Sequence, residues 1–244
     1  MFKIYIGKLI FRGSIFLTVL WIYIYRSDLI LRFLEPYIGR FSPMHLIWVI
    51  LMAGMILQMF PQNEISRITM GSRKQFSRTY VPPQEGYNKE ELYKYTLNNN
   101  IKSWIVLLAW LGLNAIFALL YLLEVIAAKE LILLSMFFYL SDLICVVIWC
   151  PFQSFIMKNR CCINCRIFNW GHFMMYTPLL FIKNFFTWSL FFTSIVVLIR
   201  WEITYAYHPY RFWEGSNTNL RCENCQEKIC KIKKPLKSTS KNTK

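Results

Sequence analysis

The sequence predicts an all-α, polytopic helical membrane protein with about five to six membrane segments arranged as antiparallel hairpins. Hydrophobic residues make up 56% of the 244 residues and charged residues only 17%, whereas roughly a quarter of a soluble domain is charged. The apolar residues form long runs that alternate with basic, polar stretches, which is the pattern of membrane spans and their connecting loops.

The formal net charge of +15 indicates which partners to expect. Many Lys and Arg residues lie beside the apolar runs, where they favour the cytoplasmic side and anionic lipid headgroups. A basic nucleic-acid-binding protein instead carries its charge on a folded, soluble face. We therefore expect membrane lipid and other membrane proteins as partners, and no nucleic acid.

Residues 1–60 are expected to form a first membrane hairpin. The apolar run 14–25 follows a basic N-terminus, and it extends towards the N-terminus if Lys8 and Arg12 snorkel to the interface. No small-residue cleavage site follows this run, so we expect a retained helix and not a signal peptide. The second apolar run covers residues 44–60.

Residues 61–103 are expected to form a basic, polar loop that faces solvent and contains a short helix at residues 89–97. Residues 104–150 then predict a second membrane hairpin. Its two runs, 104–123 and 131–150, are joined by a short acidic connection, and in lipid such a pair must pack as antiparallel helices.

Residues 151–166 form a cysteine loop, and residues 167–201 are harder to interpret. This last apolar stretch is too long for one span and too short for two, and Pro178 and Lys183 interrupt it. We favour an interfacial or re-entrant hairpin over an interfacial segment followed by a single last span. The basic, cysteine-containing tail at 202–244 is expected to be disordered near its end.

Six of the eight cysteines lie in the predicted loops, where they form two Cys-x-x-Cys pairs with one extra cysteine beside each pair. A spacer of two residues lets a tight turn aim both sulfurs at one centre. Two such turns supply the tetrahedral thiolate shell that Zn²⁺ favours. The expected metal ligands are Cys162, Cys165, Cys222 and Cys225, with Cys161 and Cys230 as possible substitutes.

Several alternatives to structural zinc remain open for these thiols. Four thiolates also hold an iron–sulfur cluster, and a Cys-x-x-Cys pair also serves as a redox dithiol. Disulfides would require an oxidising compartment, and the basic flanks of the first cluster argue against one. Unpaired thiols are a further alternative. Cys145 and Cys150 lie in an apolar run, where we expect them to pack as small apolar residues.

The placement of Lys and Arg predicts the orientation of the chain. The N-terminus, the 61–103 loop and the cysteine loop are rich in basic residues and are therefore expected to be cytoplasmic. A metal ion shared by both cysteine pairs requires an even number of crossings between Cys165 and Cys222. The hairpin interpretation of 167–201 meets that requirement and places the tail in the cytoplasm as well.

Three further residues are candidates for a function inside the membrane. Asp142 lies in the middle of an apolar run, where a carboxylate is costly and often marks an ion or proton path. Asn114 is a candidate partner for it across the second hairpin. His172 is followed by Met174 and Met175, and this combination is a possible neighbour for a soft metal such as Cu(I). The plainer interpretation of Asp142 is a protonated carboxyl that is hydrogen-bonded to a neighbouring helix. For His172 and its methionine neighbours it is packing or interfacial anchoring.

The motifs that the sequence lacks exclude some classes of function. The sequence contains no phosphate-binding glycine loop, no His-Glu-x-x-His and no Gly-x-Ser-x-Gly, so we do not expect a hydrolase or an ATP-driven enzyme. The sequence predicts a multi-pass membrane protein with a cytoplasmic Cys-x-x-Cys metal site, with structural zinc as the favoured cofactor. The alternatives are a membrane-bound iron–sulfur or dithiol electron-transfer protein and a non-catalytic subunit of a membrane complex.

Overall fold

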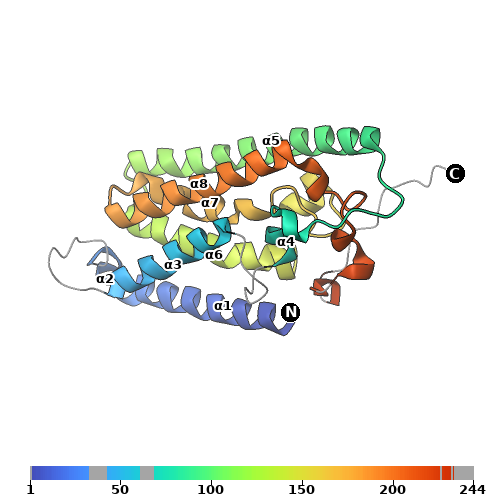
Figure 1. The fold of residues 1–244 in the computed structure, drawn as a ribbon. Helices are drawn as coiled ribbons and strands as arrows, with labels where there is room; N and C mark the ends of the chain where they lie inside the picture. Colours follow the sequence, from blue (N-terminus) through green and yellow to red (C-terminus); the bar gives the residue numbers. More distant parts are fainter. Residues whose placement is uncertain (1, 33–42, 61–68, 226, 232, 234–244) are drawn as a thin grey trace.

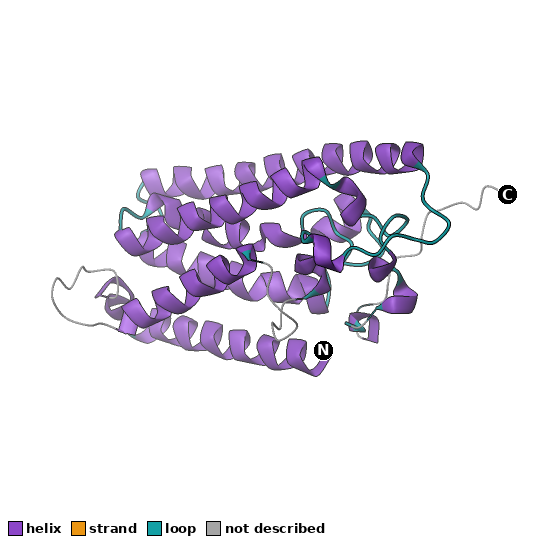
Figure 2. Ribbon diagram, in the orientation of Figure 1, coloured by secondary structure: helices purple, strands orange, loops and turns teal. Residues whose placement is uncertain are grey.

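The computed structural model describes residues 2–32, 43–60, 69–225, 227–231 and 233. Throughout this part of the chain the regular structure is helical, without strands (Figure 2). The long helices are α1 (Phe2–Tyr25), α3 (Pro43–Met59), α5 (Lys89–Leu122), α6 (Ala128–Val147) and α8 (Phe185–Tyr207). The short helices are α2 (Ser27–Arg32), α4 (Met70–Arg73) and α7 (Gly171–Tyr176).

Four of these helices, α1, α5, α6 and α8, are long and apolar enough to cross a membrane. This finding confirms the predicted class, an all-helical, multi-pass membrane protein. The predicted segment at 44–60 is also a helix, but α3 has only 17 residues, and a perpendicular span needs about 20. The number of crossings and their pairing into hairpins therefore stay predictions.

The long helices pack side by side as an elongated bundle (Figure 1). α1 packs on α6, and α3 packs on α8. α7 and the 3₁₀ turn that follows it (Thr177–Phe181) contact both α6 and α8 and so occupy the interior of the bundle. Trp110, Leu131, Tyr176, Leu190 and Phe191 form the centre of the main apolar core.

α5 differs from the prediction, because it begins at Lys89 and runs without a break through the polar stretch that we assigned to a loop. Asn88 caps its first turn by accepting a hydrogen bond from the Glu90 amide, and two glutamates there favour the positive end of the helix dipole. Its 34 residues span about 51 Å. The N-terminal turns therefore extend beyond a hydrocarbon core of about 30 Å.

The loop expected at 61–103 also differs from the prediction in its middle part. Residues 61–68 lie outside the described residues. After them, α4 and the two residues Lys74 and Gln75 are tucked against the cysteine loop, and both of these side chains are buried. The basic loop is therefore not wholly solvent-facing.

Residues 168–181 form a broken helical segment, which turns at Ile182–Asn184 into α8. The segment is about 21 Å long at the rise of an α-helix. Buried side chains cover most of its length, including Trp170, Phe173 and Leu179. Figure 1 shows the segment beside α8, so the chain doubles back inside the bundle at the polar interruption that we noted in the sequence. α8 continues six residues beyond the predicted end at 201.

Gly171 lies in close contact with Asp142 of α6. A Cβ atom at this position would lie 2.4 Å from Oδ1 of Asp142. We expect Gly171→Ala to destabilise the protein by about 1–3 kcal/mol, because either the Asp142 side chain or α7 must move. Thermal unfolding in detergent micelles measures this loss.

Gly112→Ala is the matched control, because Gly112 is also helical and a Cβ there meets no atom within 4 Å. Alanine should leave the stability at that position unchanged or raise it by up to about 1 kcal/mol. Equal effects of the two substitutions would contradict the contact between Gly171 and Asp142.

Candidate functional site

Both Cys-x-x-Cys segments fold into the tight turns that their spacing predicts. The amide of Cys165 donates to the carbonyl of Cys162 at 2.9 Å, and the amide of Cys225 donates to the carbonyl of Cys222 at 3.3 Å. The first turn is buried and the second lies at the surface. Each turn therefore presents its thiols from a compact backbone loop.

Lys74 holds the first turn from within the protein. Its Nζ donates hydrogen bonds to the carbonyl oxygens of Ile163 at 2.7 Å and Cys165 at 2.8 Å. The rings of Phe168, Trp201 and Phe212 surround the same nitrogen at centroid distances of 5.4–5.9 Å. The side chain is fully buried, and this burial lowers the pKa of Lys74 to about 7.

Arg166, directly after the first turn, attaches the cysteine loop to α8. Its guanidinium forms a two-point ion pair with Glu202 and stacks over the Tyr205 ring at 3.6 Å. Trp170 also donates to Glu202, and Trp201 donates to the Arg166 carbonyl at 2.9 Å. The loop is thus fixed on the part of α8 that leads into the tail.

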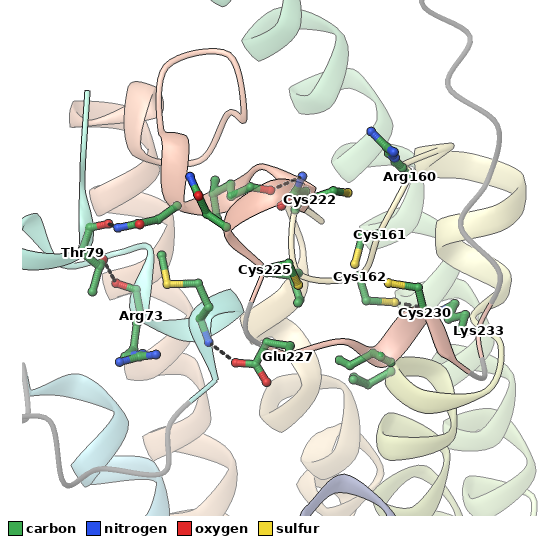
Figure 3. Close-up of a pocket in the computed structure, with 18 of the residues that line it drawn as sticks. Arg73, Thr79, Arg160, Cys161, Cys162, Cys222, Cys225, Glu227, Cys230 and Lys233 are labelled. Carbon is green, nitrogen blue, oxygen red and sulfur yellow. Dashed lines mark hydrogen bonds between the residues drawn. The ribbon is translucent and has the colours of Figure 1, made fainter. Parts of the chain in front are cut away.

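The two cysteine clusters line one cavity of about 270 Å³, which we call the outer cavity (Figure 3). The walls come from the α4 region, the cysteine loop and the tail, which are far apart in the sequence. Several basic side chains also line the cavity, among them Arg73, Arg160 and Lys233. The cysteines that line it are Cys161, Cys162, Cys222, Cys225 and Cys230.

The thiols of the outer cavity influence one another electrostatically. Burial raises the pKa of Cys161, and the nearby thiols of Cys225, Cys230 and Cys222 raise it further because neighbouring thiolates repel. Burial also raises the pKa of Cys222, while Arg160 acts in the opposite direction. A bound cation would remove this repulsion among the thiolates.

A second cavity of about 120 Å³ lies deeper, and we call it the inner cavity. Its walls are mostly apolar and aromatic, with Trp110 and Phe138 among them, and Asp142 also lines it. Cys162 lines both cavities, which are therefore neighbours. The sulfur-bearing residues of the inner cavity are Cys145, Cys150, Cys162, Cys165, Met174 and Met175.

Three of these thiols, on Cys145, Cys150 and Cys162, lie near one another. The neighbouring thiols of Cys145 and then of Cys162 lower the pKa of Cys150. Lys233 of the tail donates to the sulfur of Cys162 at 2.9 Å and to the carbonyl of Cys145 at 2.7 Å. The Cys162 thiol is also 2.9 Å from Oε1 of Gln153, to which it donates.

The expected ligand quartet is divided between the two cavities. Cys222 and Cys225 line only the outer cavity, Cys162 lines both, and Cys165 lines only the inner one. We attribute this division to Lys74, because its hydrogen bonds to the Ile163 and Cys165 carbonyls hold this part of the turn against the protein interior. In the described part of the chain, no three Cys, His, Asp or Glu side chains are gathered as a metal-binding group.

Asp142 forms an ion pair with Arg12 of α1, with Nη1 and Oδ2 2.8 Å apart. Arg12 also donates to the Tyr139 carbonyl at 2.8 Å and lies over the Tyr139 ring. Asn114, the expected partner, instead donates to the Trp110 carbonyl of its own helix. In the structure Asp142 is thus paired with the cation of α1, which is a stronger partner for a carboxylate than an amide.

His172 is half-buried beside α3, where its Nε2 lies 2.9 Å from Nε2 of Gln58. It does not line the inner cavity, although Met174 and Met175 do. The sequence interpretation missed Cys145, Cys150, Lys74 and Lys233 as parts of the site. The only signal for the first two was their closeness along the chain to Pro151 and to the cysteine loop.

The fold and the site together define a multi-pass, all-helical integral membrane protein with cysteine-lined cavities at one end of its bundle. A scan against known protein families and searches of characterised proteins and of solved structures found no significant match.

Proposed function

We propose that the outer cavity holds a structural zinc ion, which clamps the tail onto the cysteine loop of a multi-pass membrane protein. The observation that carries the proposal is the meeting of both cysteine clusters around one cavity (Figure 3). We assign the ligands to Cys161, Cys222, Cys225 and Cys230. Cys162 is not assigned as a ligand because its sulfur faces Lys233 and the inner cavity. Cys165 is not assigned because it lines only the inner cavity.

The chemistry of the cavity fits a tetrathiolate zinc site. Four thiolates around Zn²⁺ leave a net negative charge, and Arg73, Arg160 and Lys233 line the same cavity and offset it. We expect rotations about Cα–Cβ to bring the four thiols onto one ion, because all four already line the outer cavity. A zinc ion would join the tail to the cysteine loop through its thiolate ligands.

This end of the bundle is proposed to be cytoplasmic. Tyr5 near the N-terminus packs in one cluster with Ile163, Leu220 and Ile229, so the N-terminus, the cysteine loop and the tail share one end. These segments are rich in Lys and Arg, which favour the cytoplasmic side. A reducing compartment keeps the thiols available as ligands.

Metal analysis of the protein purified in mild detergent under reducing conditions tests the proposal. We expect about one zinc ion per chain in the wild type. The double variant Cys222→Ser/Cys225→Ser should lose the zinc, because it removes two of the four ligands. Cys165→Ser is the matched control and should keep it, since that thiol does not line the outer cavity.

Absence of stoichiometric zinc from the wild type would contradict the proposal, and so would its retention in the double variant. An iron–sulfur cluster, the alternative, would make the anaerobically purified protein brown with absorption near 400 nm, roughly. Stoichiometric iron together with this colour would show that the site holds an iron–sulfur cluster. The proposed function would then be electron transfer.

A further inference from the structure

The inner cavity has a composition that the zinc proposal does not explain. Six sulfur-bearing side chains line a space of about 120 Å³. Among its lining residues, Asp142 is the one carboxylate, and it is already paired with Arg12. Most of the remaining wall is aromatic or aliphatic. A cavity with many sulfurs and few available oxygens disfavours hard cations such as Mg²⁺ and Ca²⁺.

The thiols of Cys145, Cys150 and Cys162 also lie near one another on the wall of this cavity. A soft monovalent cation fits such a position, because Cu(I) is bound by thiolates and thioethers at low coordination number. The thioethers of Met174 and Met175 lie in the same cavity.

We propose that the inner cavity binds one Cu(I) ion, with the thiolates of Cys150 and Cys162 as its ligands. Binding replaces the two thiol protons, which leave to solvent, and forms two copper–sulfur bonds without any change of oxidation state. The product carries one net negative charge, and the Lys233 ammonium, 2.9 Å from the Cys162 sulfur, compensates it.

Cys162 lines both cavities, so the inner cavity lies directly beside the outer one. The inner site is independent of the proposed zinc site, whose four ligands line only the outer cavity.

Anaerobic titration of the purified, reduced protein with Cu(I), against a chromophoric Cu(I) chelator, tests the inference. We expect one tightly bound Cu(I) per chain beyond the metal already present, with Cys150→Ser weakening it by about 100-fold through loss of a ligand. Lys233→Met should weaken it by about tenfold, because the charge compensation is lost. Lys233 is only half-buried, so this variant does not threaten folding.

Zinc measured in the same samples separates this inference from the proposed function. Cys222→Ser/Cys225→Ser should lose zinc and keep tight Cu(I) binding, whereas Cys150→Ser should do the reverse. If Cys150→Ser and Lys233→Met both bind Cu(I) as tightly as the wild type, the inner site is refuted. It is also refuted if tight binding disappears with Cys222 and Cys225, because copper then occupies the outer cavity.

Discussion

Asp142→Asn is expected to destabilise the protein by about 3 kcal/mol, because it leaves the Arg12 guanidinium without a counter-ion between two membrane helices. The two charged groups are 2.8 Å apart and join α1 to α6. Their side chains are only 19% and 32% exposed, so little water is available to replace the lost ionic partner. Arg12→Met should cost a similar amount by leaving the carboxylate unpaired.

The double variant Arg12→Met/Asp142→Asn should recover most of this stability, because neither charge is then left alone. Unfolding of the four proteins in mixed detergent micelles gives the free energies and the coupling between the two sites. Lys129→Met is the control, since Lys129 and Glu130 form a looser pair at 3.9 Å near the helix end, and it should change stability by less than about 1 kcal/mol. Additive losses in the double variant would contradict a stabilising ion pair.

Lys74→Met is expected to lower the free energy of unfolding by a similar amount, about 3 kcal/mol, through a different mechanism. Methionine keeps the length and apolar stem of the side chain but cannot donate the two hydrogen bonds to the Ile163 and Cys165 carbonyls. Those oxygens would be buried without a partner, at a cost of about 1–3 kcal/mol each. Lys89→Met is the control, because Lys89 is exposed at the start of α5.

The effect of Lys74 should also depend on pH. Burial lowers the pKa of Lys74 to about 7, whereas an unfolded lysine has a pKa of about 10.4. The unfolded state therefore binds more protons between these values, and the contribution of Lys74 to stability rises with pH in that window and is flat below it. The difference in unfolding free energy between wild type and Lys74→Met should grow by about 2 kcal/mol from about pH 7 to about pH 9.

Measurement of the two proteins in parallel cancels the titration of other groups, such as the cysteines. A constant difference across this pH range would mean that Lys74 stays charged in the folded protein. A difference that shrinks with rising pH would mean that the charged form is the stabilising one. Either result would contradict the assignment of a lowered pKa to this buried amine.

The membrane helices were predictable because hydropathy is a local property of the sequence. The runs at 104–123 and 131–150 correspond to the apolar parts of α5 and α6. The N-terminal extension of α5 was not predictable in this way. Its polar residues from Lys89 onward resemble a loop when the segments that pack against them are not known. In the fold, the extension is covered in part by the tail, where Trp213 packs against the Tyr95 ring at 5.8 Å.

The candidate site was predictable only in its cysteine spacing. Both tight turns follow from the Cys-x-x-Cys pattern, but the direction in which each thiol points depends on distant residues. Lys74 illustrates this, because a lysine in a basic loop resembles a solvent-facing residue until the carbonyls and the three aromatic rings around it are known. Likewise, Arg12 was expected to snorkel, and its pairing with Asp142 requires α1 to pack on α6.

X-ray absorption at the zinc K edge of the purified wild-type protein tests most directly whether both cysteine clusters bind one metal ion. The predicted spectrum has a first shell of about four sulfur atoms at about 2.3 Å and no lighter ligand. Nitrogen or oxygen atoms at about 2.0–2.2 Å in that shell, or a protein that retains no zinc, would contradict the tetrathiolate site.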